Sequence, residues 1–277
     1  MATEKVGILH PGEMGVVVAE TVRNSGHDVL WASAGRSDET RRRAEAAGLA
    51  DAGSVGRLCE MCAVIVSVCP PEFAEPVARE VAACTFGGLY LDLNAISPER
   101  ARRIASLVAA GGGSFLDGSI IGMPARTRGQ TWIYVSGDSA SAAARFFLGG
   151  PLEFEVLGDY VGQASALKMC FAAHSKGTTA LQTAVLAAAD ALGVQDALNR
   201  QWARSGPNFE RVVAGIRTAA PKAWRFTGEM QEIGDTFDEA GVPRGFPAAA
   251  EKVYERVRDF KGTGQPDLAA ILKKVRG

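Results

Sequence analysis

The sequence has almost no net charge. Its 277 residues include 30 basic and 31 acidic ones, which gives a formal charge of −1. Nucleic acid and membrane surfaces both favour a basic excess, so the composition predicts neither as a partner. The chain also has no apolar run long enough to span a bilayer, and no basic-then-apolar N-terminus typical of a signal peptide. We therefore expect a cytoplasmic protein.

Histidine is scarce and the number of cysteines is odd. Cys59 and Cys62 form a C-x-x-C pair, but the three histidines, His10, His27 and His174, lie far from it in the sequence. A structural zinc site needs about four ligands. The five cysteines stand in apolar sequence, which predicts buried free thiols and no bound metal. Metal or redox chemistry at the C-x-x-C pair is the alternative.

The first half of the chain alternates short β-branched runs with amphipathic helical patterns. Strands are expected at Val6–Leu9, Asp28–Ala32, Val64–Cys69, Leu89–Leu93, Gly113–Asp117, Gln130–Ser136 and Phe154–Leu157. Helices are expected between the first five of them, at Gly15–Ser25, Asp38–Ala47, Pro71–Ala83 and Pro98–Ala110. Strands alternating with helices predict βαβ units and therefore a Rossmann-type, doubly wound parallel sheet.

The second half changes character. One alanine-rich helical pattern runs from Gly162 to about Leu192, longer than an average globular helix. Shorter helical segments follow at Gln195–Arg204, Asn208–Ala219, Ala223–Ala240 and Pro247–Arg258. We expect a dinucleotide-binding domain over residues 1–160 and an all-helical substrate and dimerisation domain over 161–277. The long apolar helix needs more partner surface than the remaining chain supplies, so we expect a homodimer through this helical domain.

Two of the three glycines of a dinucleotide fingerprint follow the first expected strand. Gly12 is at the position where backbone approaches a pyrophosphate, and Gly15 is where helix and strand pack closely. His10 takes the tight-turn position, and Pro11 biases it toward extended conformations. We expect His10 to line the cofactor site without acting as an acid or base. A strand–turn–helix without a ligand is the alternative. The predicted cofactor-binding residues here are His10, Pro11, Gly12, Glu13, Met14 and Gly15.

The end of the second strand distinguishes NADP from NAD. An NAD site places an acid there for the ribose 2′-hydroxyl, whereas a basic group accommodates a 2′-phosphate. No carboxylate appears before Asp38, while Ser33, Arg36 and Ser37 offer two hydroxyls and a guanidinium. These three residues are therefore predicted to bind NADP. An ordinary solvated, basic helix start is the alternative.

Asn94 follows the fourth expected strand, at the carboxyl end where open α/β sheets bind ligands. The alternative is a turn residue ahead of Ser97 and Pro98, which have the residue types of a helix cap.

Four segments carry a resemblance to the superfamily of 6-phosphogluconate dehydrogenase, β-hydroxyacid dehydrogenases and imine reductases. Gly7–Gly15 resembles the N-terminal pattern, and Phe115–Pro124, FLDGSIIGMP, resembles the substrate loop, particularly that of imine reductases. Gly162–Lys168 is similar to the start of the interdomain helix, where the dehydrogenases carry a catalytic lysine. Pro221–Met230 is similar to a little-characterised phosphogluconate-dehydrogenase-like branch.

The resemblance implies a substrate held between the two domains and further site residues. Cys69 and Pro70 would lie along the cofactor ribose, and Asn94 near the nicotinamide ribose. Lys222, Arg225 and Glu229 would reach the substrate from the helical domain, or would form an ordinary charged helix face. The implied substrate-binding residues are Ser119, Ile121, Gly122, Met123, Lys168 and Arg225.

The chain departs from both parent groups. Hydroxyacid dehydrogenases have a serine-glycine-glycine where this chain has Ile121-Gly122-Met123, and an asparagine where it has Ala172. Imine reductases usually have an aspartate or tyrosine in place of Lys168. A standard β-hydroxyacid is therefore not the expected substrate.

Lys168 interrupts a strongly apolar helical segment. Burial disfavours the ammonium form and lowers a lysine pKa toward neutrality, where the amine exchanges a proton with a substrate oxygen. Ser175 follows seven residues later on the same helical face and is the second predicted catalytic residue. A lysine extending along the surface to water is the alternative for Lys168. We expect an NADPH-dependent oxidoreductase of a small carbonyl or hydroxy compound. Imine reduction and a non-catalytic NADPH-binding regulator are the alternatives.

Overall fold

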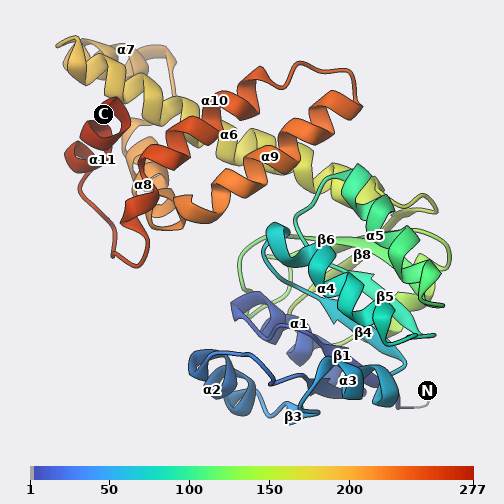
Figure 1. The fold of residues 1–277 in the computed structure, drawn as a ribbon. Coiled ribbons are helices and arrows are strands. Elements are labelled where there is room, and N and C mark those ends of the chain that lie inside the picture. Colours follow the sequence, from blue (N-terminus) through green and yellow to red (C-terminus); the bar gives the residue numbers. More distant parts are fainter. Residues whose placement is uncertain (1–2) are drawn as a thin grey trace. The chain divides into compact units, whose positions relative to one another are not determined.

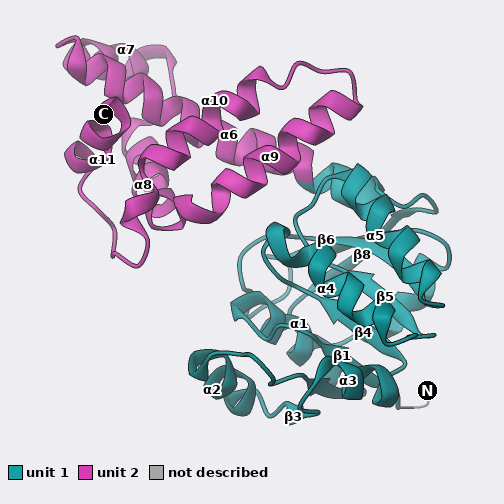
Figure 2. Ribbon diagram, viewed as in Figure 1, with its two compact units in different colours: residues 1–168 teal, residues 169–277 magenta. Residues whose placement is uncertain are grey.

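A computed structural model describes residues 3–277. The chain divides into two compact units, the first ending at Lys168 and the second running from Met169 to Gly277 (Figure 2). The boundary lies inside one long helix, α6 (Gln163–Ala191), eight residues after the predicted boundary at 160/161. The first unit is built on a sheet, and the second is entirely helical (Figure 1).

The first unit contains an eight-stranded sheet in the order β3-β2-β1-β4-β5-β6-β7-β8. The first six strands in this order are parallel, and the order reverses between β1 and β4, as in Rossmann sheets. The strands are β1 (Lys5–Ile8), β2 (Asp28–Trp31), β3 (Ala50–Asp51), β4 (Val64–Ser67), β5 (Leu89–Asp92), β6 (Ser114–Ile121), β7 (Trp132–Ser136) and β8 (Glu153–Gly158).

Helices cover both faces of this sheet (Figure 1), and neighbouring strand residues alternate between the two cores. Val64 and Val66 pack with the cluster that includes α1, while Ile65 between them packs with the cluster that includes α4 and α5. This alternation follows from the side-chain period of two in a strand. The helices are α1 (Glu13–Asn24), α2 (Asp38–Ala46), α3 (Val55–Met61), α4 (Pro71–Ala83), α5 (Pro98–Ala110) and the 3-10 helix η1 (Ala140–Phe147).

Serine caps explain where three of these helices begin. The side chains of Ser37, Ser54 and Ser97 accept hydrogen bonds from backbone N–H groups in the first turns of α2, α3 and α5. Pro98 occupies the first position of α5, where its missing N–H is not needed.

The sheet unit differs from the sequence prediction in several places. β3 and α3 were not predicted, because they are short and glycines interrupt their apolar pattern. β6 extends to Ile121, so seven of the ten residues of the predicted substrate loop are strand. β7 runs antiparallel to β6 and parallel to β8, so the sheet is mixed where a parallel sheet was expected.

The second unit packs helices around the C-terminal part of α6. α9 and α10 lie side by side along it (Figure 1). α10 begins two residues before Pro247, which is therefore not its first residue. No helix of residues 3–277 is long and apolar enough to cross a membrane. The helices are α7 (Gln195–Ser205), α8 (Phe209–Ala219), η2 (Ala220–Lys222), α9 (Ala223–Glu239), α10 (Gly245–Arg256), η3 (Arg258–Phe260) and α11 (Leu268–Arg276).

Candidate cofactor and active site

The turn after β1 meets the steric requirements of a phosphate cradle. Gly12 is the N-cap of α1, and no side chain caps this helix. A Cβ on Gly12 would meet nothing within 4 Å, which leaves room for a ligand beside the first-turn N–H groups. A Cβ on Gly15 would lie 2.2 Å from the carbonyl oxygen of His10, so only glycine fits there. The turn follows β1, next to β4, at the reversal of strand order where such sheets bind nucleotides.

His10 and Arg36 each hold a buried nitrogen without a hydrogen-bond partner within residues 3–277. These atoms are Nδ1 of His10 and Nε of Arg36. Burial, and then the positive charge of Arg36, lowers the pKa of His10 to about 4, so the ring is neutral at pH 7. Burial also lowers the pKa of Arg36, against the attraction of Glu80. Buried polar atoms are rarely left unpaired, so these two nitrogens are available to hydrogen-bond a polar ligand.

Asp51 places a carboxylate close to the end of β2, where the sequence pattern predicted none. Asp51, at the end of β3, accepts hydrogen bonds from the hydroxyl and backbone N–H of Ser33. Burial raises the pKa of Asp51, but these bonds, the N–H of Gly53 and the nearby Arg41 outweigh burial and lower it. Arg41 also donates to the carbonyl of Ser33 at 2.9 Å. Ser33 is therefore held between an acid and a base. Ser37, another of the predicted NADP-binding residues, caps α2.

Asn94 joins the ends of β4 and β5. Its Oδ1 accepts from the backbone N–H of Cys69 at 2.6 Å, and its Nδ2 donates to the Ser67 hydroxyl at 3.0 Å. Its backbone N–H donates to Asp92 at 2.8 Å. The side chain thus fixes the loop of Cys69 and Pro70 beside the phosphate cradle. These contacts assign Asn94 a structural role, because they tie the loop after β4 to the end of β5.

Asp92 is fully buried in the same cluster. Burial, opposed by the bonds from Asn94 and reinforced by the neighbouring carboxyl of Asp117, raises the pKa of Asp92 to about 7. Its Oδ2 has no hydrogen-bond partner within the described chain. The carboxyl is therefore protonated in part at neutral pH.

Lys168 reaches the end of β6. Its Nζ donates to the carbonyl oxygen of Ile120 at 2.7 Å. Ser119, the preceding residue, is fully buried, and its hydroxyl has no hydrogen-bond partner in residues 3–277. The structure thus places the predicted catalytic lysine on the backbone of β6, at the residue that follows the predicted substrate-binding Ser119. An ammonium and an unpaired hydroxyl at a strand end can hold and protonate a substrate oxygen.

Asp117 holds the start of α6 and so the position of Lys168. One carboxylate oxygen accepts from the N–H groups of Gly162 and Ser165 and from the Ser136 hydroxyl, at 2.9–3.1 Å. The other accepts from the Ser165 hydroxyl at 2.6 Å. Burial raises the pKa of Asp117 against these bonds. This buried cap lies one and a half helical turns before Lys168.

The remaining predicted site residues have varied surroundings. Ile121 ends β6, Gly122 has a φ of +135°, and Met123 is 63% exposed. The Ser175 hydroxyl donates within α6 to the carbonyl of Phe171 at 3.0 Å. Arg225 is exposed on α9, in the second unit.

Sequence reasoning missed Asp51, Asp92 and Asp117. Asp117 stands in the FLDGSIIGMP motif, but its partners lie 19 to 48 residues away. Asp51 follows β2 by twenty residues and meets Ser33 only through pairing of β3 with β2. A carboxylate at or next to the end of a predicted strand was the available signal for Asp92 and Asp117, whereas the strand that ends at Asp51 was not predicted.

The fold and the cradle define the class of NAD(P)-binding Rossmann proteins that resemble dehydrogenases and reductases. Residues 5–146, just over half of the chain, match the family described as the NAD binding domain of 6-phosphogluconate dehydrogenase, and the chain belongs to that family. Residues 189–257 match a second family, described as a domain of unknown function, DUF1932.

Solved structures agree with this assignment. The conserved protein MTH1747, described as structurally similar to 3-hydroxyacid dehydrogenases, is 29% identical with a TM-score of 0.69, over 92% of this chain and 97% of that one. The 3-hydroxyisobutyrate dehydrogenase of Mycobacterium tuberculosis shares the fold along both whole chains, at 18% identity and a TM-score of 0.70. An imine reductase from Myxococcus stipitatus, solved with NAD+, also aligns over both whole chains, at 21% identity and a TM-score of 0.57.

Proposed function

We propose that this protein is an NADPH-dependent oxidoreductase that acts on a small carbonyl or hydroxy compound, with Lys168 as the general acid and base. One observation carries the proposal: Nζ of Lys168 donates to the carbonyl oxygen of Ile120, the residue that follows Ser119 in β6. A bound nicotinamide would supply or accept the hydride. Lys168 would give a proton to the substrate oxygen or take it back, and Ser119 would orient that oxygen by a hydrogen bond.

The residues of the cradle fit a dinucleotide. His10 to Gly15 would hold the pyrophosphate at the N-terminus of α1, where Gly12 leaves space. Cys69 and Pro70, fixed by Asn94, would line the ribose side. His10 is neutral and would contribute a hydrogen bond without exchanging protons during the reaction.

NADP is the proposed cofactor because Arg36 retains an unpaired guanidinium nitrogen close to the cradle. Arg36 and Ser37 would bind the 2′-phosphate. Asp51 opposes this preference, since it engages the Ser33 hydroxyl and adds negative charge. The chain would therefore prefer NADPH while retaining some use of NADH.

Imine reduction is the second candidate. The apolar Ile121 and Met123 support it, because they replace the serine and the last glycine of the serine-glycine-glycine of hydroxyacid dehydrogenases. A panel of keto acids, aldehydes and cyclic imines, each with NADPH, separates the candidates. Turnover of carbonyls supports the first proposal, and turnover of imines alone rejects it. NADPH binding without any turnover would indicate a regulatory protein.

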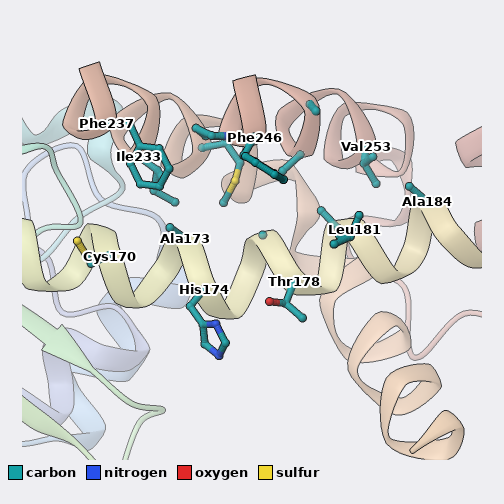
Figure 3. Close-up of a pocket in the computed structure, with 16 residues that line it drawn as sticks. Cys170, Ala173, His174, Thr178, Leu181, Ala184, Ile233, Phe237, Phe246 and Val253 are labelled. Carbon is teal, nitrogen blue, oxygen red and sulfur yellow. The ribbon is translucent and has the colours of Figure 1, made fainter. Parts of the chain in front are cut away.

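We also propose a homodimer through the helical unit. A largely apolar cavity of about 530 Å³ lies along α6, α9 and α10. In Figure 3, Leu181 and Ala173 face the helices that carry Ile233 and Phe246. Leu181 is 56% exposed and Phe246 78% exposed, an unusual exposure for such side chains. A second copy covering this face would remove the apolar surface from water.

A further inference from the structure

The helical unit holds another cavity, of about 460 Å³, with a different character. It is lined by residues of α6, α8, η2, α9 and α10. Three of the lining side chains are cationic: Lys176 of α6, Arg211 of α8 and Lys222 of η2. No carboxylate is among the described residues that line it. Ser175, the second predicted catalytic residue, also lies in its wall.

One wall of the cavity is fixed by several contacts. The Lys176 ammonium pairs with Glu229 of α9 and lies 4.8 Å from the centre of the Phe226 ring. The two charged side chains are only 20% and 11% exposed. Tyr254 of α10 donates to the carbonyl oxygen of Lys176 at 2.7 Å and packs edge-on against Phe226. This cation is therefore held in place before any ligand arrives.

Charge on the other side of the cavity is unbalanced. Glu229 neutralises Lys176, but neither Arg211 nor Lys222 pairs with a carboxylate in the part of the chain that the structure describes. Other helical arginines of this protein do have such partners one turn away, as in the pairs Arg43–Glu39, Arg57–Glu60 and Arg79–Glu75. The cavity thus gathers two uncompensated positive charges around a rigid wall.

We propose that this cavity binds a small molecule through a phosphate or carboxylate group. The planar guanidinium of Arg211 suits bidentate binding of either group, and Lys222 adds a point charge. The volume is within the range of small-molecule sites. Ser175 and Lys222 were expected near the substrate of the reaction. The inference instead gives this cavity a ligand of its own, which binds without hydride transfer.

Calorimetric titration of the full-length protein tests the site. Inorganic phosphate and succinate serve as separate probes, at constant ionic strength and with saturating NADPH so that the nucleotide cradle does not compete for them. We expect at least one probe to bind. The double variant Arg211→Ala with Lys222→Ala should weaken this binding about tenfold or more, because it removes charge-assisted hydrogen bonds. The matched double variant Arg200→Ala with Lys252→Ala removes two exposed cations outside the cavity and should bind within about twofold of the parent protein.

A second variant predicts a gain. Glu229→Gln removes a negative charge beside Lys176 and so raises the net positive charge near the cavity; binding should tighten by about threefold or more. General damage to the fold would not tighten binding. Absence of binding of both probes, equal weakening in the two double variants, or no tightening in Glu229→Gln would each overturn the proposal. The readout is affinity without turnover, so failure of the proposed reaction leaves it unaffected.

Discussion

At the residue scale, the proposed preference for NADPH depends on the opposite charges of Arg36 and Asp51. Replacing Arg36 with Ala should lower kcat/KM for NADPH about tenfold or more and leave NADH almost unchanged, because in this proposal the guanidinium binds only the 2′-phosphate. Replacing Asp51 with Asn should raise the NADPH preference by removing a negative charge near that phosphate. Steady-state kinetics with both cofactors measures these ratios. Parallel losses with NADPH and NADH in Arg36→Ala would contradict the assignment.

Ser119 provides a second test at this scale. Its hydroxyl is buried without a partner, so Ser119→Ala should leave the melting temperature unchanged or raise it slightly. If the hydroxyl binds substrate, KM should rise about tenfold, the cost of one lost hydrogen bond. Thermal melts and initial rates measure the two effects. A lower melting temperature with an unchanged KM would assign Ser119 to the core.

At the element scale, the position of Lys168 depends on how α6 begins. Asp117→Ala removes four hydrogen bonds at that end of the helix, so kcat should fall about tenfold or more while NADPH affinity stays near normal. Asn208→Ala is the control, because Asn208 caps α8 by a side-chain bond to the N–H of Arg211. It should cost about 1 kcal/mol of stability without lowering kcat. Equal kcat losses in both variants would mean that Asp117 acts only through stability.

Elements with strong periodicity were predictable from the sequence. The parallel strands follow from short apolar, β-branched runs and their helices from 3.6-residue patterns, and Ser97 with Pro98 marks the start of α5. Short β3 and α3 leave too few residues to show a period. The direction of β7 depends on pairing with β6, which local sequence does not encode. The roles of Asp51 and Asp117 could not be predicted for the same reason, because their hydrogen-bond partners come from distant segments.

At the scale of the whole molecule, the apolar face along α6 predicts the assembly. Leu181→Asp places a charge on this face and should convert a dimer into monomers, measured by sedimentation velocity. Leu148→Asp is a matched control, because Leu148 is equally exposed, at 56%, but lies in the first unit. The Leu148→Asp variant should therefore remain dimeric. A monomeric parent protein, or a dimer that persists in Leu181→Asp, would contradict the proposed interface.

The family and the fold were recognisable from sequence because two glycines, the FLDGSIIGMP segment and Lys168 lie in their expected order. The substrate could not be predicted from the sequence, since Ile121, Met123 and Ala172 replace the residues that would define it. The helical unit adds a positively charged cavity that sequence spacing does not reveal, because its cations come from three separate elements.

The central claim is that Lys168 exchanges the proton that accompanies hydride transfer. The most direct measurement is the rate of NADPH oxidation by Lys168→Ala with whichever carbonyl substrate the panel identifies, together with NADPH affinity. The account predicts a fall in kcat of about 10²-fold or more, with cofactor affinity preserved. A kcat within about threefold of the parent protein would show that the lysine has no such role.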